Sequence, residues 1–157
     1  MIEVAIEDGA WSAALPDAEA VAAAAAEAAL AEVDGMAGEI AIMLADDAAV
    51  RALNASFRGQ DKPTNVLSFP AGPGARGQAG DIALAYGVCA AEAAAQGKPL
   101  ADHLKHLVVH GVLHLYGHDH EDDGQALIME NLERRILNRL GVPDPYGVEP
   151  AAKADHV

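Results

Sequence analysis

The sequence predicts an α+β fold in one domain, with a small mixed β-sheet packed against about five helices. One observation is length, because 157 residues suffice for a single sizeable core. Another is composition: hydrophobic residues make up 52% of the chain and aromatic residues only 4%, with alanine supplying much of the apolar content. A core of close-packed helices and small aliphatic side chains is therefore expected. The third is the order of the apolar patterns: strand, helix, strand, helix, two strands and three helices.

Four short apolar segments have the pattern of β-strands. Ile2, Val4 and Ile6 alternate with intervening residues, which predicts a strand with one buried face over residues 1–7. The other strands are expected at residues 39–45, 66–69 and 81–85. The glycine-rich segment 71–80 lies between the last two and predicts a loop.

Five segments have helical spacing or helix-end signals, at about residues 16–33, 47–58, 88–96, 100–116 and 122–140. Asp46 or Asp47 can cap the second helix, and Gly59 can end it. The apolar residues predicted to face the core are Val50, Leu53 and Phe57 in the second helix, Leu104, Leu107, Val108, Gly111 and Leu115 in the fourth, and Ile128, Leu132 and Ile136 in the fifth. The domain is expected to span residues 1–146, followed by a disordered tail over 147–157.

Charge and composition exclude several classes of protein. The net charge of −14 repels polyanions, so DNA and indiscriminate nucleic-acid binding are not expected, and any RNA site should be a local basic island or depend on a metal. No secretory signal and no apolar run long enough to span a bilayer is apparent. Cys89 is the only cysteine, which excludes an intrachain disulfide and cysteine-based zinc fingers. A soluble cytoplasmic protein without a membrane partner is expected.

Six of the seven histidines lie between His103 and His120. His110 and His114 are four residues apart on a predicted helix, so their side chains project from one face. Gly117 allows the chain to turn, so that His120 can return to the same point. Three imidazoles would leave the fourth tetrahedral position of one zinc ion open for water, as in catalytic zinc sites. Zinc would lower the pKa of that water toward about 7 and so supply hydroxide for hydrolysis.

The remaining polar residues of this segment have more than one interpretation. His103 is expected to be a solvated helix residue, and His118 is expected to be exposed beside the ligand loop. His106 could be a partner of the ligands or a proton carrier, or it could be a hydrogen-bonded core residue. Asp119 could orient a ligand histidine or cap the last helix.

The histidine spacing is that of the metzincin proteases, whose metal-binding motif is H-E-x-x-H-x-x-G-x-x-H. In those proteases the glutamate is the general base, whereas this chain has Gly111 at that position. Glycine cannot accept a proton, so the sequence retains the expected metal site and disfavours peptidase activity.

A second polar segment, residues 53–70, places Arg58 and Lys62 between a predicted helix and strand. The guanidinium of Arg58 offers a planar set of donors suited to a phosphodiester, although an exposed surface arginine is the simpler interpretation of this segment alone. The sequence in these segments resembles the YbeY family of bacterial endoribonucleases, also called rRNA maturation factors. The matching motifs are LN-x-x-FRG-x-DKPTNVLSFP at 53–70, GDIAL at 80–84 and HLVVHGVLHLYGHDH at 106–120, within a resemblance that covers roughly residues 1–142.

The resemblance implies a zinc-dependent enzyme, with one Zn²⁺ per chain, that cuts single-stranded RNA in 16S rRNA 3′-end maturation and ribosome quality control. It implies His110, His114 and His120 as metal ligands, Arg58 and His114 as catalytic residues, and small-ribosomal-subunit components as partners. At the position of His118 the family usually has tyrosine.

Several alternatives stay open at this level. The general base could be hydroxide on the metal or His106, and the nucleophile could be water or the RNA 2′-hydroxyl. A ribosome assembly or quality-control factor with a largely structural zinc is the main alternative function, and a protease or another metallohydrolase is a further one. Imidazole ligands would also accept other transition ions.

Overall fold

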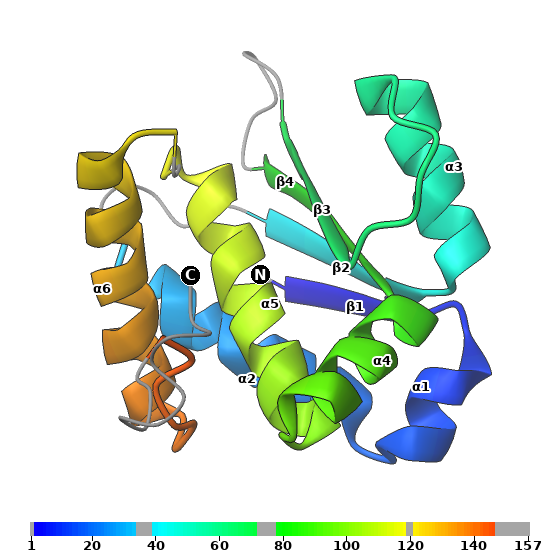
Figure 1. Ribbon diagram of the computed structural model, residues 1–157, viewed down its shortest axis with the longest axis horizontal. Coiled ribbons are helices and arrows are strands. Elements are labelled where there is room, and N and C mark those ends of the chain that lie inside the picture. Colours follow the sequence, from blue (N-terminus) through cyan, green and yellow to red (C-terminus); the bar gives the residue numbers. More distant parts are fainter. Residues whose placement is uncertain (1, 34–38, 72–77, 119–120, 147–157) are drawn as a thin grey trace.

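The computed structural model describes residues 2–33, 39–71, 78–118 and 121–146, and the fold is α+β as predicted (Figure 1). Within the described residues it has a four-stranded mixed sheet and six helices. The strands are β1 (Ile2–Ile6), β2 (Glu39–Ala45), β3 (Val66–Pro70) and β4 (Gln78–Ala85). The helices are α1 (Gly9–Ala14), α2 (Ala18–Leu30), α3 (Asp47–Arg58), α4 (Tyr86–Gln96), α5 (Leu100–Leu115) and α6 (Asp123–Arg139).

The strand order is β1-β2-β4-β3, so β3 is an edge strand of the sheet. β1 and β4 both pair with β2 in parallel, whereas β3 pairs with β4 antiparallel. All four predicted strands are present, and β4 begins at Gln78, earlier than the predicted start at residue 81. The glycine-rich segment predicted as a loop over 71–80 therefore contributes its last residues to the sheet, where Gly80 pairs with Pro70.

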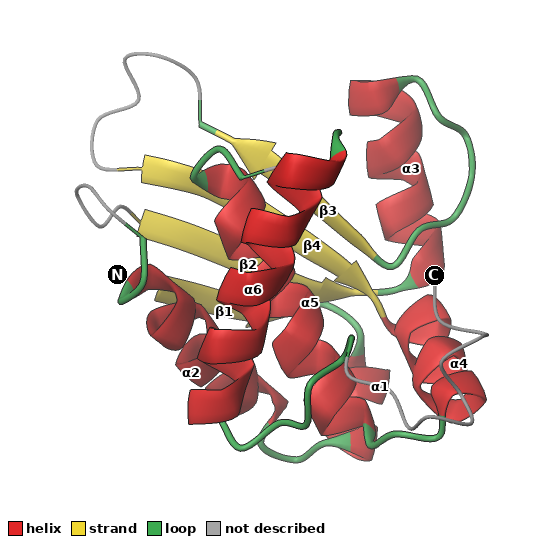
Figure 2. Cartoon of the chain, turned by 60° about the vertical axis from the view of Figure 1, so that its left-hand side comes forward, coloured by secondary structure: helices red, strands yellow, loops and turns green. Residues whose placement is uncertain are grey.

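Helices cover both faces of the sheet (Figures 1 and 2). Side chains of β2 and β4 alternate between the faces because successive residues of a strand point in opposite directions. Ile42 and Ile82 belong to the larger core, which the sheet forms with α2, α5 and α6. Ala83 belongs to a smaller core on the other face, which includes Val50 of α3. This arrangement places α5, with its histidines, directly against the sheet beside β3.

The short helix α1 was not predicted from the sequence. Its N-terminus is capped by the Asp8 carboxylate, which accepts a hydrogen bond of 3.0 Å from the backbone N–H of Ala10. Trp11 is fully buried, and its indole N–H donates to the carbonyl oxygen of Ala45 over 3.0 Å. This six-residue helix depends on a tertiary contact, so the local pattern that identifies longer helices is too weak to predict it.

Two predicted core residues on helices are exposed. Phe57 in α3 is 70% exposed and Ile128 in α6 is 57% exposed. In α3 Val50 and Asn54 are buried and Leu53 packs against the smaller core, whereas Phe57 lies about one turn further along. There the Phe57 ring contacts the edge of the Phe69 ring of β3, with the ring centroids 5.4 Å apart. An aromatic pair on the surface therefore replaces the predicted core contact.

None of the described helices is both long enough and apolar enough to cross a bilayer. The predicted tail over 147–157 lies outside the described residues, so the proposed domain boundary stays a prediction.

Gly80 is the residue of the sheet whose replacement should destabilise the fold most clearly. Its φ is 147°, and a Cβ atom there would clash with the carbonyl oxygen of Phe69 and lie 2.8 Å from a methyl carbon of Leu115. Gly80→Ala is expected to lower the free energy of unfolding by about 2 kcal/mol or more, since it combines backbone strain with overpacking. Urea denaturation measures this change. Gly9→Ala is the control, because its added Cβ meets no atom within 4 Å, and equal stability of the two variants would contradict the prediction.

Candidate active site

Helix α5 presents three histidines at successive turns on one side. His106, His110 and His114 are each four residues apart and half-buried, as expected for one helical face. The opposite side of α5 is buried in the core through apolar residues that include Leu104 and Val108. The Nε2 atoms of His110 and His114 lie 3.0 Å apart, and their ring centroids are separated by 4.5 Å. The predicted convergence of these two rings is therefore present.

A buried glutamate from α6 contacts the His110 ring. The Glu133 side chain is fully buried, and its Oε2 lies 2.8 Å from Nδ1 of His110. Its other oxygen, Oε1, lies 2.9 Å from Nε2 of His106 and accepts a 2.6 Å hydrogen bond from the Tyr146 hydroxyl. Burial alone would raise the pKa of the Glu133 carboxyl, but the hydrogen bonds from His106 and His110 outweigh burial and bring the pKa to about 2. The carboxylate is therefore ionised and serves only as an acceptor.

The described donor atoms fit a zinc ion. Two nitrogens bound to one tetrahedral zinc at about 2.0–2.1 Å would be about 3.3 Å apart, close to the 3.0 Å between the Nε2 atoms of His110 and His114. A carboxylate on the far ring nitrogen of a ligand histidine is also the usual outer partner in zinc sites. The predicted third ligand, His120, lies outside the described residues, and within the described ones no group of three or more potential ligands is gathered.

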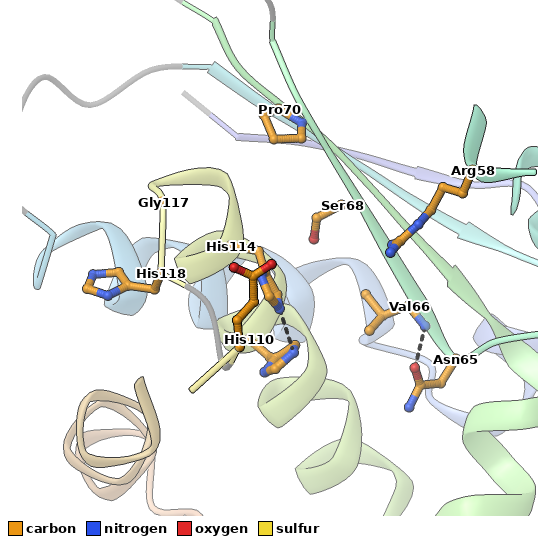
Figure 3. A pocket seen from close by; sticks show the side chains of 10 residues that line it. Arg58, Asn65, Val66, Ser68, Pro70, His110, His114, Gly117 and His118 are labelled. Carbon is orange, nitrogen blue, oxygen red and sulfur yellow. Dashed lines mark hydrogen bonds between the residues drawn. The ribbon is translucent and has the colours of Figure 1, made fainter. Parts of the chain in front are cut away.

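The two imidazoles form one wall of a cavity of about 510 Å³ (Figure 3). Its lining residues are Arg58, Asn65, Val66, Ser68, Pro70, His110, His114, Gly117, His118 and Glu121. The cavity therefore lies between β3, the last turns of α5 and the segment before α6. The Ser68 hydroxyl donates to the carbonyl oxygen of Gly111 over 3.2 Å, which joins the two walls. An added Cβ at Gly111 would lie 3.1 Å from the Ser68 hydroxyl oxygen and from Ile82, so a side chain at this position would crowd the junction.

Arg58 reaches the cavity from the end of α3. It is the last residue of the helix, at the start of the segment that the sequence predicted as a helix-to-strand loop, and Gly59 ends the helix as predicted, with a φ of 67°. The Arg58 side chain is exposed and extends toward the cavity in which His110 and His114 lie (Figure 3). The structure thus brings the predicted phosphate-binding arginine and two predicted metal ligands to one cavity. Lys62 is exposed and is not among the residues that line it.

Two of the other histidines differ from expectation. His103 was expected to be solvated, but it is only 3% exposed, and its Nε2 lies 2.8 Å from an oxygen of Glu92 in α4. Burial lowers the pKa of His103 despite this hydrogen bond. His118 was expected to be exposed, but it is half-buried and lines the cavity. Asp119, whose role was left open, lies outside the described residues.

Sequence reasoning missed Glu133 and Tyr146. Glu133 occupies the buried stripe of α6 together with Met129, Ile136 and Leu137, and a glutamate in such a stripe is the signal that could have identified it. Tyr146 offered no comparable signal, because it reaches Glu133 from the irregular segment after α6.

Comparisons with known proteins identify the family to which this fold belongs. The sequence model of the family Endoribonuclease YbeY matches residues 6–141. Proteins named Endoribonuclease YbeY from Paramagnetospirillum magneticum, Rhodopseudomonas palustris strain BisA53 and Maricaulis maris are 53%, 52% and 46% identical to this chain. These matches cover 93%, 99% and 99% of this chain and 96%, 95% and 97% of the relatives. The solution structure of TM1509 from Thermotoga maritima has the same fold, with a TM-score of 0.58 at 24% identity over 94% of this chain and 100% of that chain. The chain therefore belongs to the endoribonuclease YbeY family.

Proposed function

We propose that this protein is a zinc-dependent endoribonuclease that cuts single-stranded RNA and acts in 16S rRNA 3′-end maturation and ribosome quality control. The observation that carries the proposal is the cavity shared by His110, His114 and Arg58, in which two imidazole nitrogens converge beside a guanidinium. The names of the relatives support an endoribonuclease. The more specific role in 16S rRNA comes from the resemblance of the sequence motifs.

Each residue has a distinct part in this proposal. His110, His114 and His120 would hold the zinc ion through their ring nitrogens. A bound zinc ion would supply Lewis-acid chemistry, polarising a phosphodiester oxygen or lowering the pKa of a water molecule. Arg58 would contact the scissile phosphate and stabilise the negative charge that develops during cleavage, since a guanidinium can donate two parallel hydrogen bonds to phosphate oxygens.

The surrounding charge would restrict RNA to this site. With a net charge of −14, the protein as a whole repels RNA, and Arg58 together with a metal would form a local positive region inside it. The acidic surface would thus disfavour indiscriminate RNA binding. We propose that components of the small ribosomal subunit bring the protein to its rRNA substrate, and that this takes place in the cytoplasm.

An exposed aromatic ring next to Arg58 supports the preference for unpaired RNA. Phe57 is 70% exposed at the end of α3, where it rests on the Phe69 ring of the outer strand β3. Bases of single-stranded RNA stack on such rings, whereas bases paired in a duplex do not present a free face. A base flanking the bound phosphate could use this ring.

A cleavage assay with one RNA sequence in two forms tests the function. The labelled strand should be cut when it is single-stranded, and cut far more slowly when it is annealed to its complement. Chelation should stop cleavage and stoichiometric zinc should restore it. Analysis of the product ends identifies the nucleophile, because a 2′,3′-cyclic phosphate would show attack by the RNA 2′-hydroxyl. Undiminished cleavage after removal of the metal would contradict the proposal.

A further inference from the structure

We propose that Glu133 is a positioning residue for the metal site: its Oε2 fixes His110 in the tautomer with the proton on Nδ1, so that the Nε2 lone pair points toward His114. The inference rests on the proposed zinc-binding function and adds to it a residue from a helix that carries none of the predicted ligands. It follows from the contacts around the Glu133 carboxylate, from its burial and from the direction of the His110 ring.

The Glu133 carboxylate is held in place by donors on both oxygens. Oε1 faces Nε2 of His106 at 2.9 Å and the Tyr146 hydroxyl at 2.6 Å, and Oε2 faces Nδ1 of His110 at 2.8 Å. With both oxygens engaged in a fully buried position, rotation of the carboxylate would break several hydrogen bonds away from water. Oε2 therefore remains directed at His110.

This contact decides which nitrogen of His110 can bind a metal. Oε2 of Glu133 lies 2.8 Å from Nδ1 of His110, and because a carboxylate oxygen accepts in such a contact, Nδ1 supplies the proton. In the neutral ring the other nitrogen, Nε2, then carries a lone pair instead of a proton, and this atom lies 3.0 Å from Nε2 of His114 beside the cavity. The opposite tautomer would place a proton on Nε2 and prevent coordination. Glu133 thus prepares the ligand before metal arrives.

A second histidine–carboxylate pair, between His103 of α5 and the partly exposed Glu92 of α4, supplies a matched control. Nε2 of His103 lies 2.8 Å from an oxygen of Glu92, but this histidine is only 3% exposed and is not among the residues that line the cavity. Both pairs join a histidine of α5 to a glutamate of a neighbouring helix. Replacement of Glu92 by glutamine therefore tests the general effect of disturbing a histidine–carboxylate pair on α5, whereas the same replacement at Glu133 tests the orientation of His110.

The experiment begins with the unaltered protein freed of metal. Nitrogen-15 NMR of the histidine rings distinguishes the two tautomers, and His110 is expected to carry its proton on Nδ1. In Glu133→Gln the side-chain amide replaces one acceptor with a donor, so His110 should shift toward the Nε2-protonated form. Zinc affinity, measured by competition with a chromophoric chelator, should fall by about 10- to 100-fold, as for loss of other outer partners of metal ligands. Glu92→Gln should leave both the His110 tautomer and the zinc affinity unchanged.

A second variant separates the two oxygens of Glu133. Tyr146→Phe removes a donor from Oε1 and leaves the contact of Oε2 with His110, so the tautomer should persist and zinc affinity should stay close to that of the unaltered protein. This variant and the measurement on the unaltered protein remain informative if Glu133→Gln does not fold.

Two results would overturn the inference. One is a metal-free protein in which His110 carries its proton on Nε2, and the other is a folded Glu133→Gln protein with unchanged zinc affinity. Failure of the unaltered protein to bind zinc would instead contradict the proposed function. The tautomer measurement distinguishes these cases, because it requires no metal.

Discussion

Replacement of His110 and His114 together by alanine is expected to abolish stoichiometric zinc binding and RNA cleavage while the protein still folds. The Nε2 atoms of His110 and His114 lie 3.0 Å apart, close enough for both to bind one zinc ion. Loss of even an outer partner of a metal ligand costs about 10- to 100-fold in affinity, and loss of a ligand should cost more. Each single variant should therefore weaken zinc binding by more than about 100-fold. Elemental analysis after dialysis against dilute zinc measures the effect.

The control for this prediction is His156→Ala, which removes a histidine far along the sequence from the cluster and should leave the zinc content at one per chain. Circular dichroism verifies that the variants are folded, which is expected because the side chains of His110 and His114 are only half-buried. A doubly substituted protein, whether at His110 and His114 or at His114 and His120, that retained one tightly bound zinc would defeat the ligand assignment.

Arg58→Ala is expected to lower kcat for single-stranded RNA by about 100- to 1,000-fold, the usual cost of removing one donor that stabilises transition-state charge. Zinc content and the free energy of unfolding should not change, because the Arg58 side chain is exposed at the end of α3. Arg58→Lys should recover only part of the rate, since an ammonium keeps the charge and loses the planar pair of donors. Single-turnover cleavage at saturating enzyme isolates this step.

Arg51→Ala is the matched control for Arg58. Arg51 lies on the same helix, is also exposed, and pairs with Asp61 at 2.9 Å rather than lining the cavity. Its removal should leave cleavage near the rate of the unaltered protein. If Arg58→Ala processed rRNA normally, the enzyme proposal would fail and the alternative of an assembly factor with a structural zinc would be favoured.

Local patterns predicted the fold well where each element carries its own signal. Strand β2 occupies the predicted residues 39–45 because a continuous apolar run identifies a strand buried on both faces. Gly59 and Gly97 end α3 and α4 with φ of 67°, a conformation that glycine adopts without strain. Helix α1 depends instead on the indole of Trp11 reaching the carbonyl of Ala45, a contact between residues 34 positions apart that no short window contains.

Some features of the candidate site could likewise be predicted from local sequence, whereas others depend on tertiary contacts. The spacing of His110 and His114 determines their common face, so their convergence could be predicted from helix geometry alone. The burial of His103 could not be predicted in this way, because it depends on contact with Glu92 of the neighbouring helix α4. The orientation of His110 by Glu133 likewise requires α6 to lie beside α5, which is a property of the tertiary packing.

X-ray absorption at the zinc edge tests most directly whether imidazoles hold a zinc ion with one position open for reactants. The reconstituted protein should show three imidazole nitrogens and one further light atom at about 2.0 Å. Addition of a small thiol should then replace that light atom with sulfur at about 2.3 Å, because the fourth position is exchangeable. A spectrum with fewer than three imidazoles, or one that the thiol leaves unchanged because a fourth side chain closes the site, would contradict the catalytic account.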